Sequence, residues 1–358
     1  MNTPVGSEKR KLKIKDLWNL SLTNSLDFVS GMSAMVDIPQ VERALVTGGA
    51  GFIGSHLVDR LLADQTEVVV LDSLASGRLE NLATWNKHSS LQFIKADLRD
   101  LAKLPKAAIN CETVFHLAAN PDVQSSSCDP GAHYTNNLVA TFNLLEAIRK
   151  AGGVKTLVFT STSTVYGDAV EIPTSEDYSP LLPVSIYGAC KLASEALIVS
   201  YAYNYGFNAL ICRLANVIGS RSQHGIVHDF IDKLRKNPKR LEILGDGTQT
   251  KSYLHVADCV EAILTGIKRL SERVGMYNVG SEDQANVKQI ANIVCDEMGL
   301  KNVEYCFTGG VDGGRGWKGD VKIMLLRVEK LKKLGWEPKL NSCGAIRKTV
   351  KELLYEGS

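Results

Sequence analysis

Four glycines crowd into the stretch from Ala44 to Gly54, which reads Ala-Leu-Val-Thr-Gly-Gly-Ala-Gly-Phe-Ile-Gly. A short apolar run that ends at Thr47 predicts a buried strand, and the apolar side chains from Phe52 to Leu62 recur at helical spacing. Glycine is required where a backbone turns sharply or comes within contact distance of a ligand. The first turn of a helix offers unpaired N–H groups to a phosphate. The stretch therefore predicts a strand, a tight turn that binds an anion, and a helix.

An acidic residue follows at the distance that dinucleotide binding needs. The run Glu67 to Leu71 reads as a second buried strand and leads directly into Asp72, 18 residues past Gly54. A carboxylate there accepts hydrogen bonds from ribose hydroxyls and repels a 2′-phosphate. With glycines at 48, 51 and 54, this order of elements predicts a dinucleotide site that takes NAD rather than NADP.

Strands and helices alternate regularly from Val41 onward. Further strands are predicted at 91–95, 113–116 and 155–160, and a helix at about 136–151 is ended by Gly152. This alternation predicts a parallel, doubly wound α/β sheet with helices on both faces and ligands at the carboxyl ends of the strands. We expect residues 41–215 to form mainly the dinucleotide domain and 216–358 mainly a substrate domain, interleaved with the first.

Composition narrows the class of protein. The 358 residues carry a formal net charge of +2, which gives no general reason to expect a nucleic acid partner. Eight scattered cysteines contain no CxxC pair, so neither zinc nor a disulfide framework is expected, and a reduced, cytoplasmic protein is predicted. Residues 1–40 are predicted to be a flexible extension. A basic run within them leaves open an amphipathic membrane contact, which we do not favour.

The predicted chemistry lies after the fifth strand. Ser161 to Gly167 places several hydroxyls in one loop, and Tyr187 and Lys191 stand one turn apart on a predicted helix. A phenol is a weak base at neutral pH. The ammonium of Lys191, together with the positive nicotinamide of bound NAD, is expected to lower the pKa of Tyr187. Such a tyrosine can take a hydroxyl proton while hydride leaves the same carbon for the cofactor.

These motifs together resemble one family. The chain from about 43 to 354 is similar to extended short-chain dehydrogenases/reductases of the NAD-dependent sugar epimerase/dehydratase family. The resemblance implies a Rossmann-type doubly wound parallel sheet with a smaller C-terminal α/β substrate domain. It also implies 4-epimerisation of a UDP-sugar through a 4-keto intermediate, with UDP-glucose and UDP-galactose or their N-acetylated counterparts as substrates. A homodimer is usual in such a family.

The resemblance also implies roles for individual residues. Tyr187 would be the catalytic base and acid, Lys191 would hold the ribose and tune the tyrosine, and Thr162 would contact the reacting hydroxyl. The implied cofactor site comprises Gly48, Gly51, Phe52, Ile53, Gly54, Asp72, Ser73, Leu74, Ser76, Gly77, Asp97, Leu98, Leu117, Ala118, Ala119, Asn137, Tyr187 and Lys191. The implied substrate site comprises Thr162, Asn216, Lys251 and Arg315, with Lys318 as an alternative to Arg315.

Three alternatives stay open at this point. A UDP-glucuronate decarboxylase or a 4-ketoreductase would use the same cofactor site, although we identify no cation for a C6 carboxylate and Gln124 weakens the first. The third is a non-catalytic NAD-binding regulatory protein, which the intact Thr162, Tyr187 and Lys191 disfavour. A 4,6-dehydratase is not expected, because Ser163 and Thr164 stand where that chemistry needs an acidic pair.

Overall fold

The structure is a computed structural model that describes residues 41–85, 87–100 and 111–355. The predicted extension at 1–40 lies outside the described residues. A seven-stranded sheet runs in the order β11-β6-β5-β4-β1-β2-β3, and every neighbouring pair is parallel. Its strands are β1 (Arg43–Thr47), β2 (Glu67–Asp72), β3 (Leu91–Lys95), β4 (Thr113–His116), β5 (Thr156–Thr162), β6 (Asn208–Leu214) and β11 (Val274–Val279). The predicted doubly wound α/β fold is confirmed.

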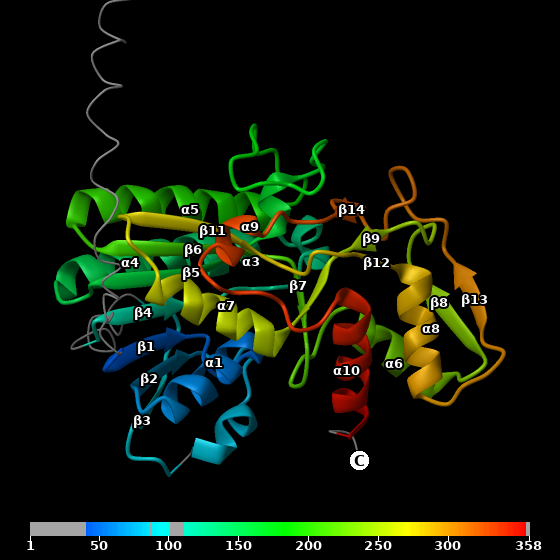
Figure 1. The fold of residues 1–358 in the computed structure, drawn as a ribbon, viewed down its shortest axis with the longest axis horizontal. Helices are drawn as coiled ribbons and strands as arrows, with labels where there is room; N and C mark the ends of the chain where they lie inside the picture. The colour runs from blue at the N-terminus through cyan, green and yellow to red at the C-terminus, as the bar shows by residue number, and fades with distance from the viewer. Residues whose placement is uncertain (1–40, 86, 101–110, 356–358) are drawn as a thin grey trace, which may run out of the picture. The chain divides into compact units, whose positions relative to one another are not determined.

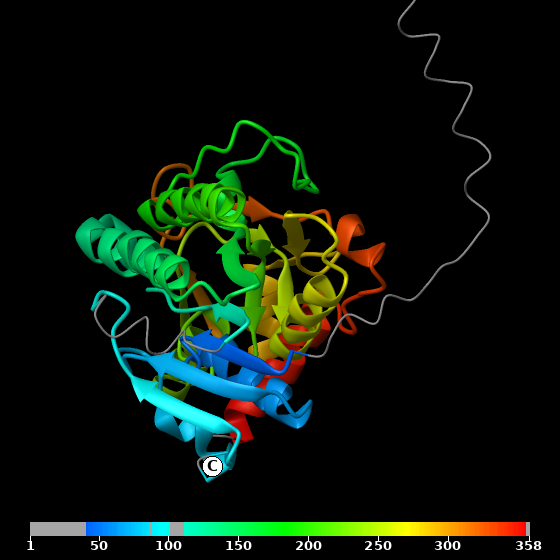
Figure 2. The ribbon, with the colours of Figure 1, turned by 90° about the vertical axis from the view of Figure 1, so that its left-hand side faces the viewer.

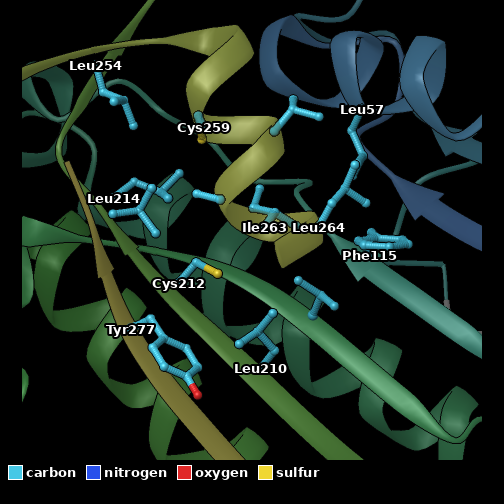
Figure 3. Packing of buried hydrophobic residues seen from close by; sticks show 14 of the residues in the cluster. Leu57, Phe115, Leu210, Cys212, Leu214, Leu254, Cys259, Ile263, Leu264 and Tyr277 are labelled. Atoms are coloured by element: carbon cyan, nitrogen blue, oxygen red, sulfur yellow. The ribbon is translucent and has the colours of Figure 1, made fainter. Parts of the chain in front are cut away.

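Helices cover both faces of this sheet (Figures 1 and 2). One face packs against α1 (Phe52–Ala63) and α7 (Val256–Lys268), and the other against α4 (Ala140–Ala151) and α5 (Ile186–Tyr205). Residues alternate between the two cores along each strand, as Leu210 and Ile211 of β6 do. Figure 3 shows Leu57 of α1 and Ile263 of α7 meeting the strands on the first face. Each fully buried leucine there stabilises the fold by about 1.5–3 kcal/mol.

The C-terminal segments form a third core around shorter sheets. Their strands are β7 (Asn216–Ile218), β8 (Arg240–Ile243), β9 (Thr250–Lys251), β10 (Tyr253–His255), β12 (Ala285–Asn286), β13 (Glu304–Phe307) and β14 (Ile323–Met324). Their helices are α6 (Ile226–Lys236), α8 (Val287–Glu297), α9 (Glu329–Lys332) and α10 (Ser342–Tyr355). After β10 the chain returns to the large sheet through α7 and β11. The segments after β7 therefore contribute both to the large sheet and to the smaller sheets.

The helix predicted at about 136–151 begins earlier than expected. The segment α3 (Pro130–His133) runs into a π-helical turn, η4 (Tyr134–Val139), and then into α4. The Asp129 side chain caps α3 by accepting from the Ala132 amide at 2.9 Å, and Pro130 occupies the first turn. The 3₁₀ turns are η2 (Leu79–Trp85), η3 (Gln124–Ser127) and η5 (Ser163–Tyr166).

The glycine turn supports a stability prediction. A Cβ at Gly54 would lie 2.1 Å from the Gly48 carbonyl oxygen, which is backbone and cannot move aside. We expect Gly54→Ala to lower the free energy of unfolding by about 3 kcal/mol or more in urea denaturation. Gly153→Ala is the control, because a Cβ there meets nothing within 4 Å, and a change within about 0.5 kcal/mol is expected. Equal effects of the two substitutions would contradict this account.

Candidate functional site

The predicted cofactor residues gather at one edge of the sheet. Parallel strands place their carboxyl ends together, and β1 to β4 are followed there by segments 48–54, 72–77, 97–98 and 117–119. Gly48 has a φ of 71°, and a Cβ on it would lie 2.7 Å from the Ala118 amide nitrogen. The first turn of α1 carries no acidic side chain. This edge thus combines a backbone cradle with helix N–H groups suited to a diphosphate.

Asp72 is tied to the glycine turn at the end of β2. One carboxylate oxygen accepts from the Ala50 amide at 3.0 Å, and the other accepts from the Leu74 amide at 2.8 Å. A Cβ at Gly77 would lie 2.9 Å from both oxygens, so only glycine fits against this buried carboxylate. Each oxygen keeps a second lone pair. The position is therefore compatible with the predicted ribose contact.

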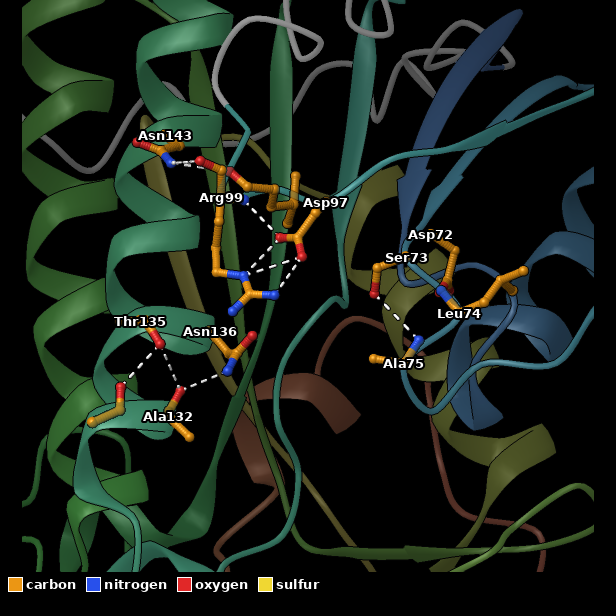
Figure 4. A network of polar contacts seen from close by, with 12 residues as sticks. Asp72, Ser73, Leu74, Ala75, Asp97, Arg99, Ala132, Thr135, Asn136 and Asn143 are labelled. Atoms are coloured by element: carbon orange, nitrogen blue, oxygen red, sulfur yellow. Dashed lines mark hydrogen bonds and ion pairs between the residues drawn. The ribbon is translucent and has the colours of Figure 1, made fainter.

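Asp97 lies across the same edge, after β3 (Figure 4). Its carboxylate pairs with Arg99, whose Nη2 lies 2.6 Å from Oδ2, and this pairing lowers the pKa of Asp97. Ser73 accepts from the Ala75 amide at 3.3 Å, as Figure 4 shows. Asp72 and Asp97 thus lie at the carboxyl ends of two neighbouring strands, β2 and β3.

Asn137 supports the loop after β4 with its side chain. Its Oδ1 accepts from the Asn120 amide at 2.7 Å, and its Nδ2 donates to the Asn120 carbonyl at 3.2 Å. The π-helical turn η4 carries this residue, and such turns are frequent at functional sites. Both polar groups of the buried amide are therefore used in shaping the loop.

The predicted catalytic residues are brought together by β5 and α5. The Ser185 side chain caps α5 by accepting from the Gly188 amide at 3.0 Å, which fixes the start of the helix just before Tyr187. Lys191 Nζ donates to the Thr160 carbonyl at 2.8 Å and lies 4.5 Å from the centre of the Phe159 ring. Thr162, the last residue of β5, hydrogen-bonds with Tyr187.

The pKa of Tyr187 differs from the sequence-based expectation. Burial raises the pKa of Tyr187 to about 12, and the hydrogen bond with Thr162 only partly opposes this rise. Burial likewise lowers the pKa of Lys191 to about 8. Among the protein's own groups, desolvation of the phenolate is therefore the larger effect. The expected lowering of this pKa concerned the protein with NAD bound, so it stays a prediction.

His133 is a neighbour of the site that sequence reasoning missed. Its ring lies edge-on to Tyr187 with ring centres 6.1 Å apart, and it is fully buried. Its Nδ1 lies 3.4 Å from Nδ2 of Asn137. The sequence signal that could have placed it is the Asp129-Pro130 pair, because this pair starts a helix at Pro130, three residues before His133.

Apart from Thr162, the predicted substrate residues lie in the C-terminal segments, one loop of which meets the start of α5. A Cβ at Gly319 would lie 2.9 Å from the Val184 carbonyl, so the loop at 309–320 abuts the start of α5. Arg315 in this loop forms a two-pronged pair with Asp168, at 2.8 and 3.0 Å. The alternative, Lys318, is exposed.

Lys251 and Asn216 lie beside each other in the same region. Lys251 Nζ lies 2.6 Å from Asp320 Oδ1 and 5.4 Å from the centre of the Trp317 ring. Asn216 Nδ2 donates to the carbonyl of Ser252, the residue next to Lys251, at 3.2 Å. Lys251 and Arg315, the two cations predicted to bind phosphate, thus each form an ion pair with a carboxylate.

In the ranges 41–85, 87–100 and 111–355, no helix is long and apolar enough to cross a membrane. Within the same ranges, no three His, Cys, Asp or Glu side chains are grouped so that they could hold a metal ion.

Comparisons with known proteins identify the family. The model of the NAD-dependent epimerase/dehydratase family matches residues 44–280. The UDP-glucose 4-epimerase of Mycolicibacterium smegmatis is 36% identical over 318 residues, which cover 86% of this chain and 97% of that protein. The chain therefore belongs to the NAD-dependent epimerase/dehydratase family, as predicted, and NAD as its cofactor is confirmed at the level of the family.

Solved structures agree with this assignment. A crystal structure of a UDP-galactose 4-epimerase is 45% identical, covers 88% of this chain and 99% of its own, and superposes with a TM-score of 0.78. The UDP-N-acetylglucosamine 4-epimerase of Methanobrevibacter ruminantium, solved with UDP-N-acetylmuramic acid, is 30% identical with a TM-score of 0.78. That match covers 89% of this chain and 100% of the other. Both similar proteins are named as 4-epimerases of UDP-sugars.

The buried His116 at the end of β4 supports a prediction of pH dependence. Burial and the charge of Lys191 lower the pKa of His116 to about 3. Between that value and the unfolded value near 6.5, the unfolded chain binds more protons, so stability falls as the pH drops. We expect the free energy of unfolding to lose about 2 kcal/mol from this residue between pH 7 and pH 5. Urea denaturation at both values measures it.

His116→Gln should flatten this part of the pH dependence, because glutamine does not titrate. His224→Gln, at an exposed position, is the matched control and should leave the slope as it is. A slope that is the same in all three proteins would contradict the assignment to His116.

Proposed function

We propose that this protein is an NAD-dependent 4-epimerase of UDP-sugars, which interconverts UDP-glucose and UDP-galactose or their N-acetylated counterparts. The observation that carries the proposal is the junction of β5 and α5. There, Thr162, Tyr187 and Lys191 meet at the edge of the sheet that also holds the glycine turn and Asp72. The similarity to 4-epimerases of UDP-sugars supports it independently.

The residues present fit NAD. Side chains at Gly48 and Gly54 would fill the cradle before α1, and the carboxylate of Asp72 favours free ribose hydroxyls. When bound, NAD supplies a hydride acceptor next to the reacting carbon and a positive charge on its nicotinamide. This charge adds to that of Lys191 and favours the phenolate of Tyr187 against the effect of burial.

In the proposed mechanism Tyr187 moves the proton. Its phenolate oxygen takes the proton from the sugar O4 hydroxyl while the C4 hydrogen leaves as hydride, which gives a 4-keto sugar. Thr162 orients the hydroxyl by hydrogen bonding. The keto sugar then turns about its diphosphate, hydride returns to the opposite face of C4, and Tyr187 gives the proton back to O4. Electrons and protons balance, so no external oxidant is consumed.

We assign the diphosphate to Lys251, Arg315 and Asn216. Arg315 lies in the loop that abuts the start of α5 and pairs with Asp168, and Lys251 pairs with Asp320 of the same loop. A planar guanidinium binds a phosphate through two parallel hydrogen bonds, whereas the ammonium of Lys251 acts as a point charge. Met324 of β14 is buried in the core, which supports a packing role for it.

Incubation with UDP-sugars tests the function. The purified protein, without added NAD, is mixed separately with UDP-glucose, UDP-galactose and their two N-acetylamino counterparts, and the products are separated by chromatography. We expect interconversion at C4 within one pair, and the faster pair names the substrate. If all four sugars stay unchanged even after NAD is added, the 4-epimerase assignment fails.

Tyr187→Phe tests the proton transfer. Removal of the phenol should lower kcat by about 100- to 10,000-fold, because general acid–base catalysis contributes that much. Tyr203→Phe is the matched control, since Tyr203 lies on the same helix with 69% of its surface exposed. NAD content measured after denaturation should be similar in both variants. Full activity of Tyr187→Phe would overturn the mechanism.

The homodimer and the cytoplasmic location stay predictions from the sequence, and sedimentation of the purified protein tests the first.

A further inference from the structure

A charged pair is buried directly behind the catalytic residues. Glu195 and Arg213 are each 2% exposed, and Arg213 Nη2 lies 2.7 Å from Glu195 Oε2. Arg213 Nε donates to Glu195 Oε1 at 3.1 Å, so the pairing is two-pronged. Tyr166 accepts from Arg213 Nη1 at 3.0 Å on the other side. A buried pair of this kind is costly to desolvate and is weak evidence for a role in stability alone.

Glu195 also reaches the strand that carries Thr162. Ser161 Oγ donates to Glu195 Oε1 at 2.5 Å. The residues on either side of Ser161 are held by the same helix, since Lys191 donates to the Thr160 carbonyl and Tyr187 hydrogen-bonds with Thr162. Three successive residues at the end of β5 thus form hydrogen bonds with three residues of α5 that are spaced one turn apart. Glu195 is the last of these three helix residues.

The surroundings of Lys191 show what the charge of Glu195 does. On its own helix Lys191 has Tyr187 and Glu195, each one turn away. His116 of β4 is neutral at pH 7, because its pKa is lowered to about 3. β5 contributes the Thr160 carbonyl and the Phe159 ring, and Arg213 of β6 pairs with Glu195.

Two of these effects on Lys191 oppose each other. Burial lowers the pKa of Lys191 to about 8, and the charge of Glu195 raises it. Glu195 is therefore the one anion among these neighbours that favours the ammonium form of Lys191. Arg213 pairs with both carboxylate oxygens of Glu195 and so balances part of that negative charge.

We propose that Glu195 is a positioning residue for the reaction, which holds the end of β5 through Ser161 and keeps Lys191 in its ammonium form, with Arg213 as the counterweight. The proposal rests on the proposed function, because it assigns Lys191 and Tyr187 to catalysis. The ammonium of Lys191 then favours the phenolate of Tyr187. Activity should be lost on the alkaline side when Lys191 gives up its proton.

Two substitutions of opposite sign test this. Glu195→Gln removes the anion and keeps an acceptor for Ser161, so the alkaline limb of kcat/KM should move to lower pH by about one unit. Arg213→Met leaves the anion unbalanced and should move the limb to higher pH. The double substitution should return it to within about half a unit of the parent protein. Tyr166→Phe, which removes a hydrogen bond of Arg213 without changing charge, should leave the limb in place.

A second measurement needs no catalysis. The difference in free energy of unfolding between the parent protein and Lys191→Met should rise with pH from about 8, because the unfolded chain then binds more protons at this residue. In the Glu195→Gln background the rise should begin at lower pH. If neither single variant folds, the double variant decides, and a Lys191 titration displaced by more than about half a unit overturns the proposal.

The outcomes separate the two proposals. If the parent protein epimerises none of the sugars, the function fails, while the stability titration still tests the coupling of Glu195 to Lys191. If the parent is active and Glu195→Gln leaves both the alkaline limb and the titration unmoved, the function stands and the role of Glu195 is overturned.

Discussion

The close approach of backbone to backbone at the glycine turn is the constraint on which the site depends. Gly54 at the start of α1 lies against the Gly48 carbonyl, and Gly48 lies against the loop after β4. The same turn donates the Ala50 amide to Asp72 at the end of β2. Three neighbouring strands are therefore fixed to one another at their carboxyl ends. A cofactor site that spans these ends needs no other scaffold, because the parallel sheet has already aligned them.

Burial of the site disfavours the charged forms of Tyr187 and Lys191 that the proposed reaction needs. The apolar packing that positions Tyr187 and Lys191 also disfavours the charge on each, since both pKa values move toward the neutral form. Charge must then come from outside the pair. Under the proposed function, Glu195 on one side favours the ammonium of Lys191, and the cofactor on the other favours the phenolate of Tyr187. The reaction then depends in part on Glu195, which is buried behind the catalytic residues.

Much of the fold and the site could be predicted from sequence, because the signals were local. Glycine spacing, the acid that ends β2 and the Tyr187–Lys191 spacing each reflect one turn or one helix. Sequence reasoning missed the features that depend on segments distant along the chain. These are the position of His133, the ion-pair partners of Arg315 and Lys251, and the raised pKa of Tyr187. The roles of the individual site residues stay predictions.

The carboxylates that hold Arg315 and Lys251 have a consequence for turnover. Asp168 and Asp320 occupy the charges that a diphosphate would use, so they compete with it. Under the proposed function, part of the attraction between protein and ligand is spent in breaking these pairs. The same pairs re-form as a product leaves, so Lys251 and Arg315 are each paired with an anion both with and without the ligand. Such internal competitors trade tight binding for rapid exchange, which suits an enzyme whose substrate and product differ at a single carbon.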